Sequence, residues 1–191
     1  MCNTPKKTHK MKYSLILSFL ILLNCTNSKT KKEDFNLFEI EIPKTWKKIK
    51  LKGIDSNVGA IITDKNDTIF YDYGLYSNDL TEKPIIIDKK MLSFIKESNK
   101  NFDKSEFIVV SNLDSVNIEN YKLNNETNAI ISNLNCKIIN PKKIGNGITG
   151  IYFPNVKKSD SKIIKFNLIG TNLNEDNNEL LLQAFHTIKF K

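Results

Sequence analysis

Short segments in which apolar and polar residues alternate recur along this chain, and they limit its fold more than any other feature. Between Leu37 and Ile42, three apolar residues alternate with Glu39 and Glu41, and Pro43 follows. Side chains two positions apart lie on the same face of a β-strand, so this pattern predicts a half-buried strand that ends at the proline. Similar patterns predict further strands at Trp46–Lys52, Val58–Thr63, Thr68–Gly74, Phe107–Val110, Asn128–Ser132, Cys136–Asn140, Thr149–Phe153 and Ile163–Ile169.

Two segments have the spacing of a helix rather than that of a strand. Asp88–Ser98 opens on an aspartate suited to cap a helix. Asn174–His186 opens on an asparagine cap followed by two acidic residues, which favour the positive end of the helix dipole. Leu181, Phe185 and Ile188 form an apolar stripe in and just after this second segment, and we expect them to be buried against a sheet.

The connections favour an antiparallel arrangement of the strands. Asp64–Asp67 consists of turn-forming residues between two predicted strands, which is typical of a β-hairpin. The polar stretch Ser111–Asn128 is expected to form an exposed loop or an irregular excursion. These features predict an α+β fold, a mostly antiparallel β-sheet covered by helices, within a single globular domain that covers Phe35–Lys191.

The basic residues are unusual because all 29 of them are lysine and none is arginine. The chain therefore has no arginine finger and no bidentate guanidinium for recognising phosphate or guanine. The two histidines, His9 and His186, are too few for a histidine-rich metal centre. Four of the 29 lysines precede residue 25 and all 21 acidic residues follow it, so the remainder carries a net charge of +4. This charge is too small to indicate a nucleic-acid partner. We also expect no cofactor and no metal.

The N-terminal residues have the organisation of a secretory signal. Lysines precede the apolar run Ser14–Leu23, which is too short for a membrane-spanning helix because such a helix needs about 20 residues. Leu22–Cys25 resembles the lipobox of bacterial lipoproteins. The resemblance implies that residues 1–24 are a lipoprotein signal peptide and that Cys25 becomes an N-terminus that carries acyl chains, palmitate among them. Translation could begin at Met1 or at Met11.

The residues after the signal indicate how the domain is attached to a membrane. Residues 25–34 are expected to form the lipidated cysteine and a flexible tether, because Thr26–Asp34 lacks aliphatic side chains. Cys2 leaves with the signal and Cys25 is acylated, so Cys136 is the only free thiol and no intramolecular disulfide can form. Acyl chains hold a protein at a membrane without a spanning helix. We expect a lipid-anchored protein of the cell envelope, at the outer membrane of a Gram-negative bacterium.

Two parts of the predicted domain resemble PsbP/Mog1-type domains. Phe38–Trp46 is similar to their start, where a strand ends in a proline and a tryptophan follows, and Leu181–Phe190 is similar to their final helix and strand. Three further blocks resemble an uncharacterised group of envelope lipoproteins: Gly53–Ser56, Phe70–Ser77 and Thr149–Phe153. The resemblance implies an α/β/α sandwich whose antiparallel sheet lies between helices, with roles in binding and assembly rather than in catalysis.

Five residues form the candidate ligand site. Asp72, Tyr73 and Tyr76 come from a predicted strand and its end, and Asp55 and Ser56 come from the preceding loop. A carboxylate in apolar surroundings has a raised pKa and can act as a general base. The alternative is an exposed aspartate on the polar face of a half-buried strand, with the tyrosine rings in the core. No histidine or second acid can be assigned as a partner of Asp72, so no catalytic residue is assigned.

Three other motifs have structural explanations. Gly145–Gly150 matches G-x-G-x-x-G, but it leads into a predicted strand, so we expect a turn rather than a dinucleotide site. Cys136 lies in a predicted strand, where a lone thiol is expected to be a core residue. The five lysines within Lys44–Lys52 could bind anionic lipid or polysaccharide, or form a solvated strand face that discourages edge pairing.

From the sequence we expect a non-enzymatic binding or scaffolding domain, held at a membrane by acyl chains on Cys25. Its partner would be another envelope protein or a polysaccharide. The alternative is an envelope hydrolase or small-ligand enzyme that uses Asp55, Ser56, Asp72 and Tyr76. A cavity in which these side chains converge would favour the enzyme.

Overall fold

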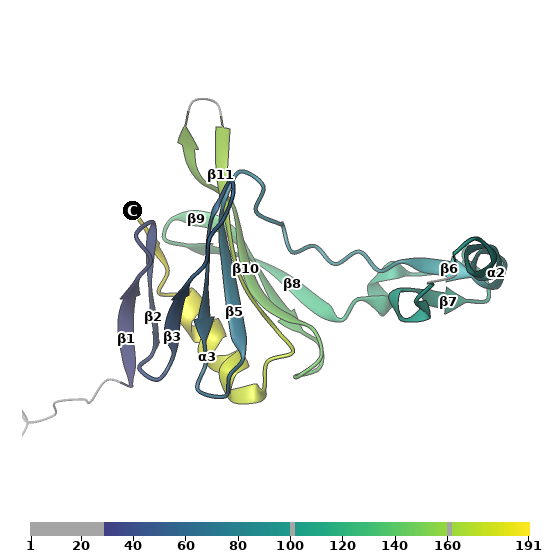
Figure 1. Ribbon diagram of the computed structural model, residues 1–191, viewed down its shortest axis with the longest axis horizontal. Helices are drawn as coiled ribbons and strands as arrows, with labels where there is room; N and C mark the ends of the chain where they lie inside the picture. Colours follow the sequence, from purple (N-terminus) through teal and green to yellow (C-terminus); the bar gives the residue numbers. More distant parts are fainter. Residues whose placement is uncertain (1–28, 100–101, 160–161) are drawn as a thin grey trace, which may run out of the picture.

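In the computed structural model, which describes residues 29–99, 102–159 and 162–191, the chain is built around one large antiparallel sheet (Figure 1). Its strands are β3 (Lys47–Lys50), β4 (Asn57–Ile62), β5 (Thr68–Gly74), β8 (Asn124–Ile131), β9 (Leu134–Pro141), β10 (Ile148–Ser159) and β11 (Lys162–Thr171). They lie in the order β3-β4-β5-β11-β10-β9-β8. The chain thus builds β3 to β5, leaves the sheet, returns at the far border as β8, and works back until β11 pairs with β5.

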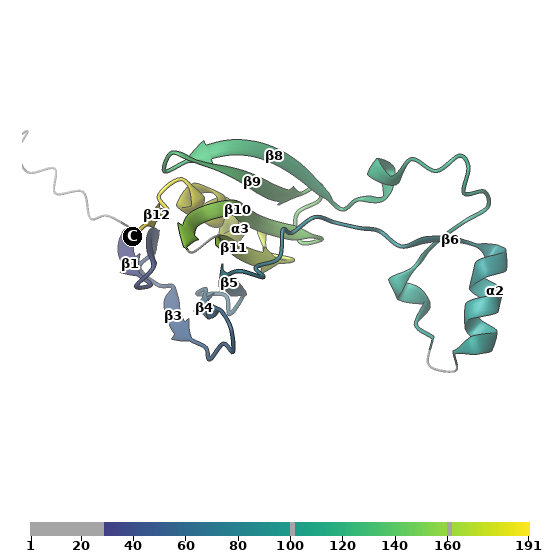
Figure 2. The ribbon, with the colours of Figure 1, turned by 90° about the horizontal axis from the view of Figure 1, so that it is seen from above.

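One face of this sheet, here called the inner face, is covered by helix α3 (Glu175–Phe185) and by a second antiparallel sheet (Figure 1 and Figure 2). The second sheet consists of β1 (Thr30–Asp34), β2 (Phe38–Pro43) and β12 (Lys189–Phe190), in the order β1-β2-β12. Leu181, Phe185 and Ile188 are fully buried, which confirms the predicted apolar stripe. The other large side chains of this core include Phe35, Phe38, Trp46, Phe153 and Phe166.

The β4–β5 hairpin is tied to the first turn of α3 by polar side chains. Oδ2 of Asp67 accepts hydrogen bonds from Nδ2 of Asn174 at 2.9 Å and from Nδ2 of Asn177 at 2.7 Å. Nδ2 of Asn177 also donates to Oγ1 of Thr63 at 3.0 Å, and Asn174 caps the helix. The sequence predicts the turn and the cap separately, and the structure brings them into contact. This contact fixes the helix on the inner face.

The opposite, outer face is crossed by the segment 75–85, which leaves β5 and runs over β11, β10 and β9 (Figure 2). Nδ2 of Asn167 on β11 donates to the carbonyl of Asn78 at 3.0 Å. Leu80 packs against side chains of β9 and β10 and has a φ of 58°, a conformation that is rare for leucine. The fit requires Gly150, because a Cβ at that position would lie 2.8 Å from Cδ1 of Leu80.

The crossing segment leads to a small unit, here called the arm, that projects from one end of the molecule (Figure 1 and Figure 2). It contains β6 (Ile86–Asp88), α2 (Lys89–Ser98), the 3-10 turn Lys104–Glu106 and β7 (Ile108–Val110), and β6 and β7 pair in parallel. Asp88 accepts a hydrogen bond from the N–H of Met91 at 2.7 Å, which confirms the predicted helix and its cap. The helix α2 has no buried residue, and Met91 and Phe94 are exposed.

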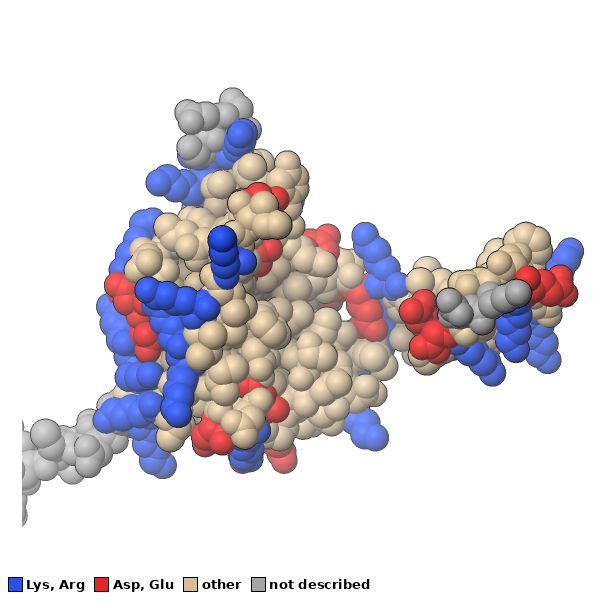
Figure 3. Space-filling view, viewed as in Figure 1, with Lys and Arg blue, Asp and Glu red and all other residues tan. Residues whose placement is uncertain are grey.

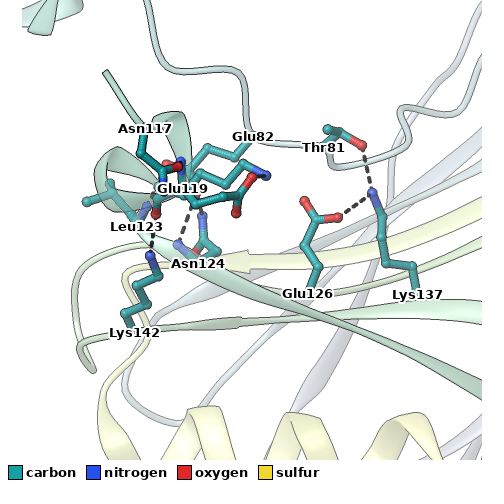
Figure 4. Close-up of polar contacts among 10 residues, drawn as sticks. Thr81, Glu82, Asn117, Glu119, Leu123, Asn124, Glu126, Lys137 and Lys142 are labelled. Atoms are coloured by element: carbon teal, nitrogen blue, oxygen red, sulfur yellow. Dashed lines mark hydrogen bonds and ion pairs between the residues drawn. The ribbon is translucent and has the colours of Figure 1, made fainter. Parts of the chain in front are cut away.

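A polar network holds the base of the arm where the chain leaves and re-enters the sheet (Figure 4). Oε1 of Glu82 accepts a hydrogen bond from the N–H of Leu123 at 2.8 Å, and Oε2 accepts bonds from Asn124. The returning segment contains a second 3-10 turn, Ile118–Tyr121. Nζ of Lys142 donates to the carbonyl of Glu119 in this turn at 2.9 Å. The two links to the arm are therefore joined to each other and to β9.

Of the tether expected at residues 25–34, residues 25–28 lie outside the described residues, and most of the rest is a strand. Thr30–Asp34, five of those ten residues, forms strand β1, so the prediction is wrong for this half. The strand pairs with β2 over its whole length, from Thr30 opposite Pro43 to Asp34 opposite Glu39. An ion pair of 2.6 Å between Lys32 and Glu39 joins the two strands. A partner strand has imposed strand structure on a segment whose own residues favour a flexible chain.

The mostly antiparallel α+β class is confirmed, but the single sheet is wrong. The described residues form three sheets, of seven, three and two strands, and the last of these is parallel. Helical cover is also limited, since α3 packs on the inner face whereas α2 lies in the arm. Gly145 and Gly147 both have positive φ in the turn before β10, so the first half of the glycine motif is a turn, as predicted, and its second half begins the strand.

Candidate functional site

Three of the five predicted site residues lie together in one cavity. Asp55, Ser56 and Tyr73 line a cavity of about 620 Å³ at one end of β4 and β5. Its other lining residues are Ile54, Asn57, Gly74, Leu75, Lys162 and Ile164. The loop approaches β5 closely because residue 74 is glycine, since a Cβ there would lie 2.5 Å from the Cβ of Ser56.

The other two predicted site residues do not line this cavity. Asp72 lies in register with Val58 on β4 and Asn167 on β11. Its Oδ1 is buried without a hydrogen-bond partner. Tyr76 is 77% exposed in the turn after β5. The structure therefore does not gather the aspartates, the serine and the tyrosines into one site.

The faces of β5 follow the predicted alternation. Tyr71 and Tyr73 are buried on the inner face, and Phe70 is half exposed on the outer face that it shares with Asp72. Burial raises the pKa of Tyr73, so its phenol is protonated at neutral pH. Among the residues that the structure describes, the other titratable side chains that line the cavity are Asp55 and Lys162, and none is a histidine. This set can hydrogen-bond a polar ligand, but it does not form an acid–base pair.

A second cavity, here called the groove, lies over β8, β9 and β10. It has a volume of about 520 Å³ and is lined by Asn128, Ala129, Ile130, Asn135, Cys136, Lys137, Tyr152 and Pro154. Ile130, Tyr152 and Pro154 provide apolar surface, while the two asparagines provide hydrogen-bonding groups at strand positions on the outer face. A mainly apolar concavity with a few polar groups is the usual form of a binding site.

The segment that crosses the outer face borders the groove. Nζ of Lys137 donates to Oγ1 of Thr81 in this segment at 2.7 Å and pairs with Glu126 at 3.3 Å (Figure 4). Burial raises the pKa of Tyr152, and the nearby negative charge of Asp79 raises it further. The groove thus offers a neutral phenol and a lysine whose charge is already compensated.

Strand β8 forms the border of the sheet beside the groove (Figure 2) and pairs with β9 on one side only. The carbonyl of Leu123 accepts from the N–H of Lys142 at 2.7 Å, so the carbonyl of residue 123 faces β9. The N–H of Asn124 faces away from β9 and donates to Glu82 at 3.0 Å. Backbone groups alternate in direction from one residue to the next along an antiparallel pair. The outward N–H of Asn124 therefore shows that the backbone groups of every second residue after it also face away from β9.

The alternation leaves a row of backbone groups open along β8. The N–H and C=O groups of Glu126, Asn128 and Ile130 face away from β9, and no strand of the described chain pairs with them. The opposite border is better protected, because β3 has only four residues and three of them are lysine. In contrast, β8 has eight residues without lysine or proline, and its one charged residue, Glu126, is paired.

Sequence reasoning missed both the groove and the open border. The groove is assembled from three strands whose order in the sheet cannot be read from local patterns. The one available signal was Ile130, an apolar residue at a position that alternation places on the face opposite Ala129 and Ile131. Its side chain is 73% exposed. Cys136, which also lines the groove, is a buried core residue as predicted.

Among the residues that the structure describes, no group of three or more histidine, cysteine, aspartate or glutamate side chains could hold a metal ion. Neither helix in this part of the chain is long and apolar enough to cross a membrane. Cys25, the predicted site of lipid attachment, lies outside the described residues. A scan against models of protein families and a search of curated proteins each found no match.

Proposed function

We propose that the chain is a lipid-anchored, non-enzymatic protein of the cell envelope that binds an extended segment of another envelope protein along β8. The observation that carries this proposal is the open border of β8, which lies directly beside the groove. An added strand would hydrogen-bond to the backbone of Glu126, Asn128 and Ile130, and alternate side chains of that strand would face the groove. Backbone bonds then give affinity, and the groove gives specificity.

The anchoring part of the proposal rests on the N-terminal residues. The lipobox at Leu22–Cys25 supplies an acyl attachment point, and Thr30 already belongs to β1, so a short segment joins the domain to the membrane. Acyl chains on Cys25 would keep the protein at the outer membrane of a Gram-negative bacterium. The enzyme alternative has less support, because Asp72 and Tyr76 lie outside the cavity that Asp55 and Ser56 line.

We also propose that the domain is related to the PsbP/Mog1 type. A central antiparallel sheet followed by the helix α3 and the short strand β12 supports the relation. The α/β/α arrangement of that type has helices on both faces of the sheet, whereas among the residues that the structure describes the one helix on the sheet is α3, on the inner face.

Strand addition is tested with a photo-crosslinking amino acid at Ile130, which is exposed and lines the groove. We expect a discrete adduct with one envelope protein in living cells. Asn128→Pro in the same chain should abolish the adduct, because proline removes an outward N–H while leaving the β9 ladder intact. Asn128→Ala is the matched control and should keep the adduct.

A synthetic peptide with the crosslinked sequence should then bind the purified chain. Its Kd should rise at least about tenfold for Asn128→Pro and clearly less for Asn128→Ala, because the alanine variant loses the side-chain amide in the groove but keeps the outward N–H. A crosslinker at Phe70, four strands away from β8, should give no such adduct. The proposal is wrong if both positions give the same adducts, if a polysaccharide rather than a protein is captured, or if Asn128→Pro binds normally.

Acylation is tested separately by growing cells with an alkyne fatty acid. The wild-type chain should be labelled, Cys25→Ser should not be, and Cys136→Ser should keep the label because Cys136 is a buried core residue. Labelling that persists in Cys25→Ser would refute the anchor.

A further inference from the structure

Charge is distributed very unevenly over the domain. The end of the molecule formed by residues 29–52 and 187–191, here called the terminal end, contains ten lysines and four acidic residues, a net charge of +6. The rest of the domain, residues 53–186, contains 15 lysines and 17 acidic residues, a net charge of −2. Figure 3 shows the resulting concentration of blue lysine atoms around β1, β2 and β3.

The acidic residues of the terminal end are largely engaged within it. Lys31 pairs with Glu33 at 3.1 Å, Lys32 with Glu39 at 2.6 Å, and Lys191 with Asp34 at 2.6 Å. Six exposed lysines of this end have no ion pair among the described residues: Lys29, Lys44, Lys47, Lys50, Lys52 and Lys189. Their charge is available to an external anion.

Two apolar side chains are also exposed in this lysine-rich part of the chain. Ile49 is 40% exposed and Leu51 is 45% exposed, and they alternate with Lys50 and Lys52 in and just after β3. Exposed aliphatic residues among lysines are typical of surfaces that enter the boundary between lipid headgroups and acyl chains. A binding surface for a soluble polyanion has no need of such residues.

The position of the anchor adds an independent argument. Only five peptide links separate Cys25 from Thr30, the first residue of β1, and they span at most about 18 Å when fully extended. The terminal end is therefore held close to any bilayer that holds Cys25. This part of the argument rests on the proposed acylation.

We propose that the terminal end docks on an anionic membrane surface, with Lys47, Lys50 and Lys52 on lipid headgroups and with Ile49 and Leu51 at the interface. Anionic leaflets attract lysines over roughly a Debye length, about 8 Å at physiological ionic strength. The arm lies at the opposite end of the long axis of the molecule (Figure 1). Docking therefore fixes the orientation of the domain and directs the arm away from the bilayer.

The test measures the reactivity of individual lysines in the full acylated chain. The protein is placed in vesicles of phosphatidylcholine, with or without phosphatidylglycerol, and is treated with an amine-acylating reagent before mass spectrometry. On the anionic vesicles, Lys47, Lys50 and Lys52 should react several-fold more slowly than on the neutral vesicles, and high salt should remove the difference. Lys89 and Lys96 of α2 are exposed internal controls and should not change.

A second measurement tests membrane docking in a chain that has no acyl anchor. The Cys25→Ser chain should bind the anionic vesicles in low salt, and the triple variant Lys47→Gln/Lys50→Gln/Lys52→Gln should bind several-fold more weakly. The matched triple variant Lys89→Gln/Lys90→Gln/Lys96→Gln should bind as well as its parent. Because all six lysines are exposed, neither variant should disturb the fold.

The outcomes separate the two proposals. Wild-type protein that fails to float with neutral vesicles would refute the acylation and leave the docking face to be judged from the Cys25→Ser chain. Equal protection on neutral and anionic vesicles, protection of the arm lysines, or unchanged binding of the Lys47/Lys50/Lys52 variant would each overturn the docking proposal. Protection by a soluble polyanion but not by vesicles would overturn it as well.

Discussion

The carboxylate of Glu82 binds Asn124 twice, because Oε2 accepts hydrogen bonds from its backbone N–H at 3.0 Å and from its Nδ2 at 2.7 Å. Oδ1 of the same Asn124 accepts from the N–H of Ile148 at 2.6 Å. One buried asparagine thus joins the chain that leaves for the arm, the first residue of β8 and the first residue of β10. The position of the arm relative to the sheet depends on these bonds.

Glu82→Ala should therefore loosen the base of the arm. Hydrogen bonds to charged groups contribute about 1.5–3 kcal/mol, and this change leaves the amides of Leu123 and Asn124 without their acceptor. Hydrogen exchange of both amides should become faster. Glu119→Ala is the control, since it removes the ion pair with Lys122 but keeps the backbone carbonyl that binds Lys142. Unchanged protection in Glu82→Ala would contradict the role given to this carboxylate.

Leu80 and Gly150 should be energetically coupled. A methyl group at residue 150 would lie 2.8 Å from Cδ1 of Leu80, so Gly150→Ala should lower the free energy of unfolding by about 1–3 kcal/mol. Leu80→Ala removes the clash, and Gly150→Ala should then cost clearly less. Denaturant unfolding of the two single variants and the double variant gives the coupling energy. Strictly additive losses would show that the crossing segment is not held by this contact.

The core beneath α3 should be sensitive to a large-to-small change. Leu181 is fully buried between the helix and the sheets, so Leu181→Ala should lower the free energy of unfolding by about 2–5 kcal/mol. Glu179→Ala, at an exposed position of the same helix, should change it by less than about 0.5 kcal/mol. Urea unfolding followed by the fluorescence of buried Trp46 measures both. A similar small effect for the two variants would contradict the packing described.

The thiol of Cys136 should respond to pH through its burial. Burial raises the pKa of this thiol, so the native state disfavours the thiolate. The contribution to stability is fully present below the pKa of the unfolded thiol, about 8.5, and is lost as the pH rises through the folded pKa. Iodoacetamide should label Cys136 much more slowly in the native chain than in denaturant at pH 8.

The control for this prediction is Cys136→Ala. Its free energy of unfolding should fall less between about pH 8 and pH 9.5 than that of the wild-type chain. Rapid labelling of the native thiol, or identical pH profiles, would show that the thiol is accessible to solvent.

Much of the fold follows from local patterns, because alternation with a period of two is a local consequence of burying one face of a strand. The turn before β5 and the helix caps Asp88 and Asn174 are also predictable, because each depends on residues that are close together in the sequence. The strand β1 is not, because its charged residues form a strand only when β2 is beside them. The pairing of β5 with β11 is also hidden, since it joins segments about 95 residues apart.

The two candidate cavities also differ in how well the sequence predicts them. The loop at Asp55 and the strand at Tyr73 are neighbours along a hairpin, and the cavity that they share could be anticipated from the sequence. The groove could not, because Ile130, Lys137 and Tyr152 meet only through the order of β8, β9 and β10. Asp72 was a natural candidate as an acid beside aromatic residues, but strand alternation turns it away from that cavity.

The pairing of β12 with β2 has a consequence for the order in which the molecule can be made. Phe190 lies opposite Phe38, and the N–H of Lys191 donates to the carbonyl of Leu37 at 3.0 Å, so the first hairpin shares its sheet with the last residues of the chain. A ribosome delivers Phe38 long before it delivers Phe190. The aromatic core around Phe38 and Phe166 therefore cannot close completely until β12 has left the ribosome, so the first strands of the chain wait for its last ones.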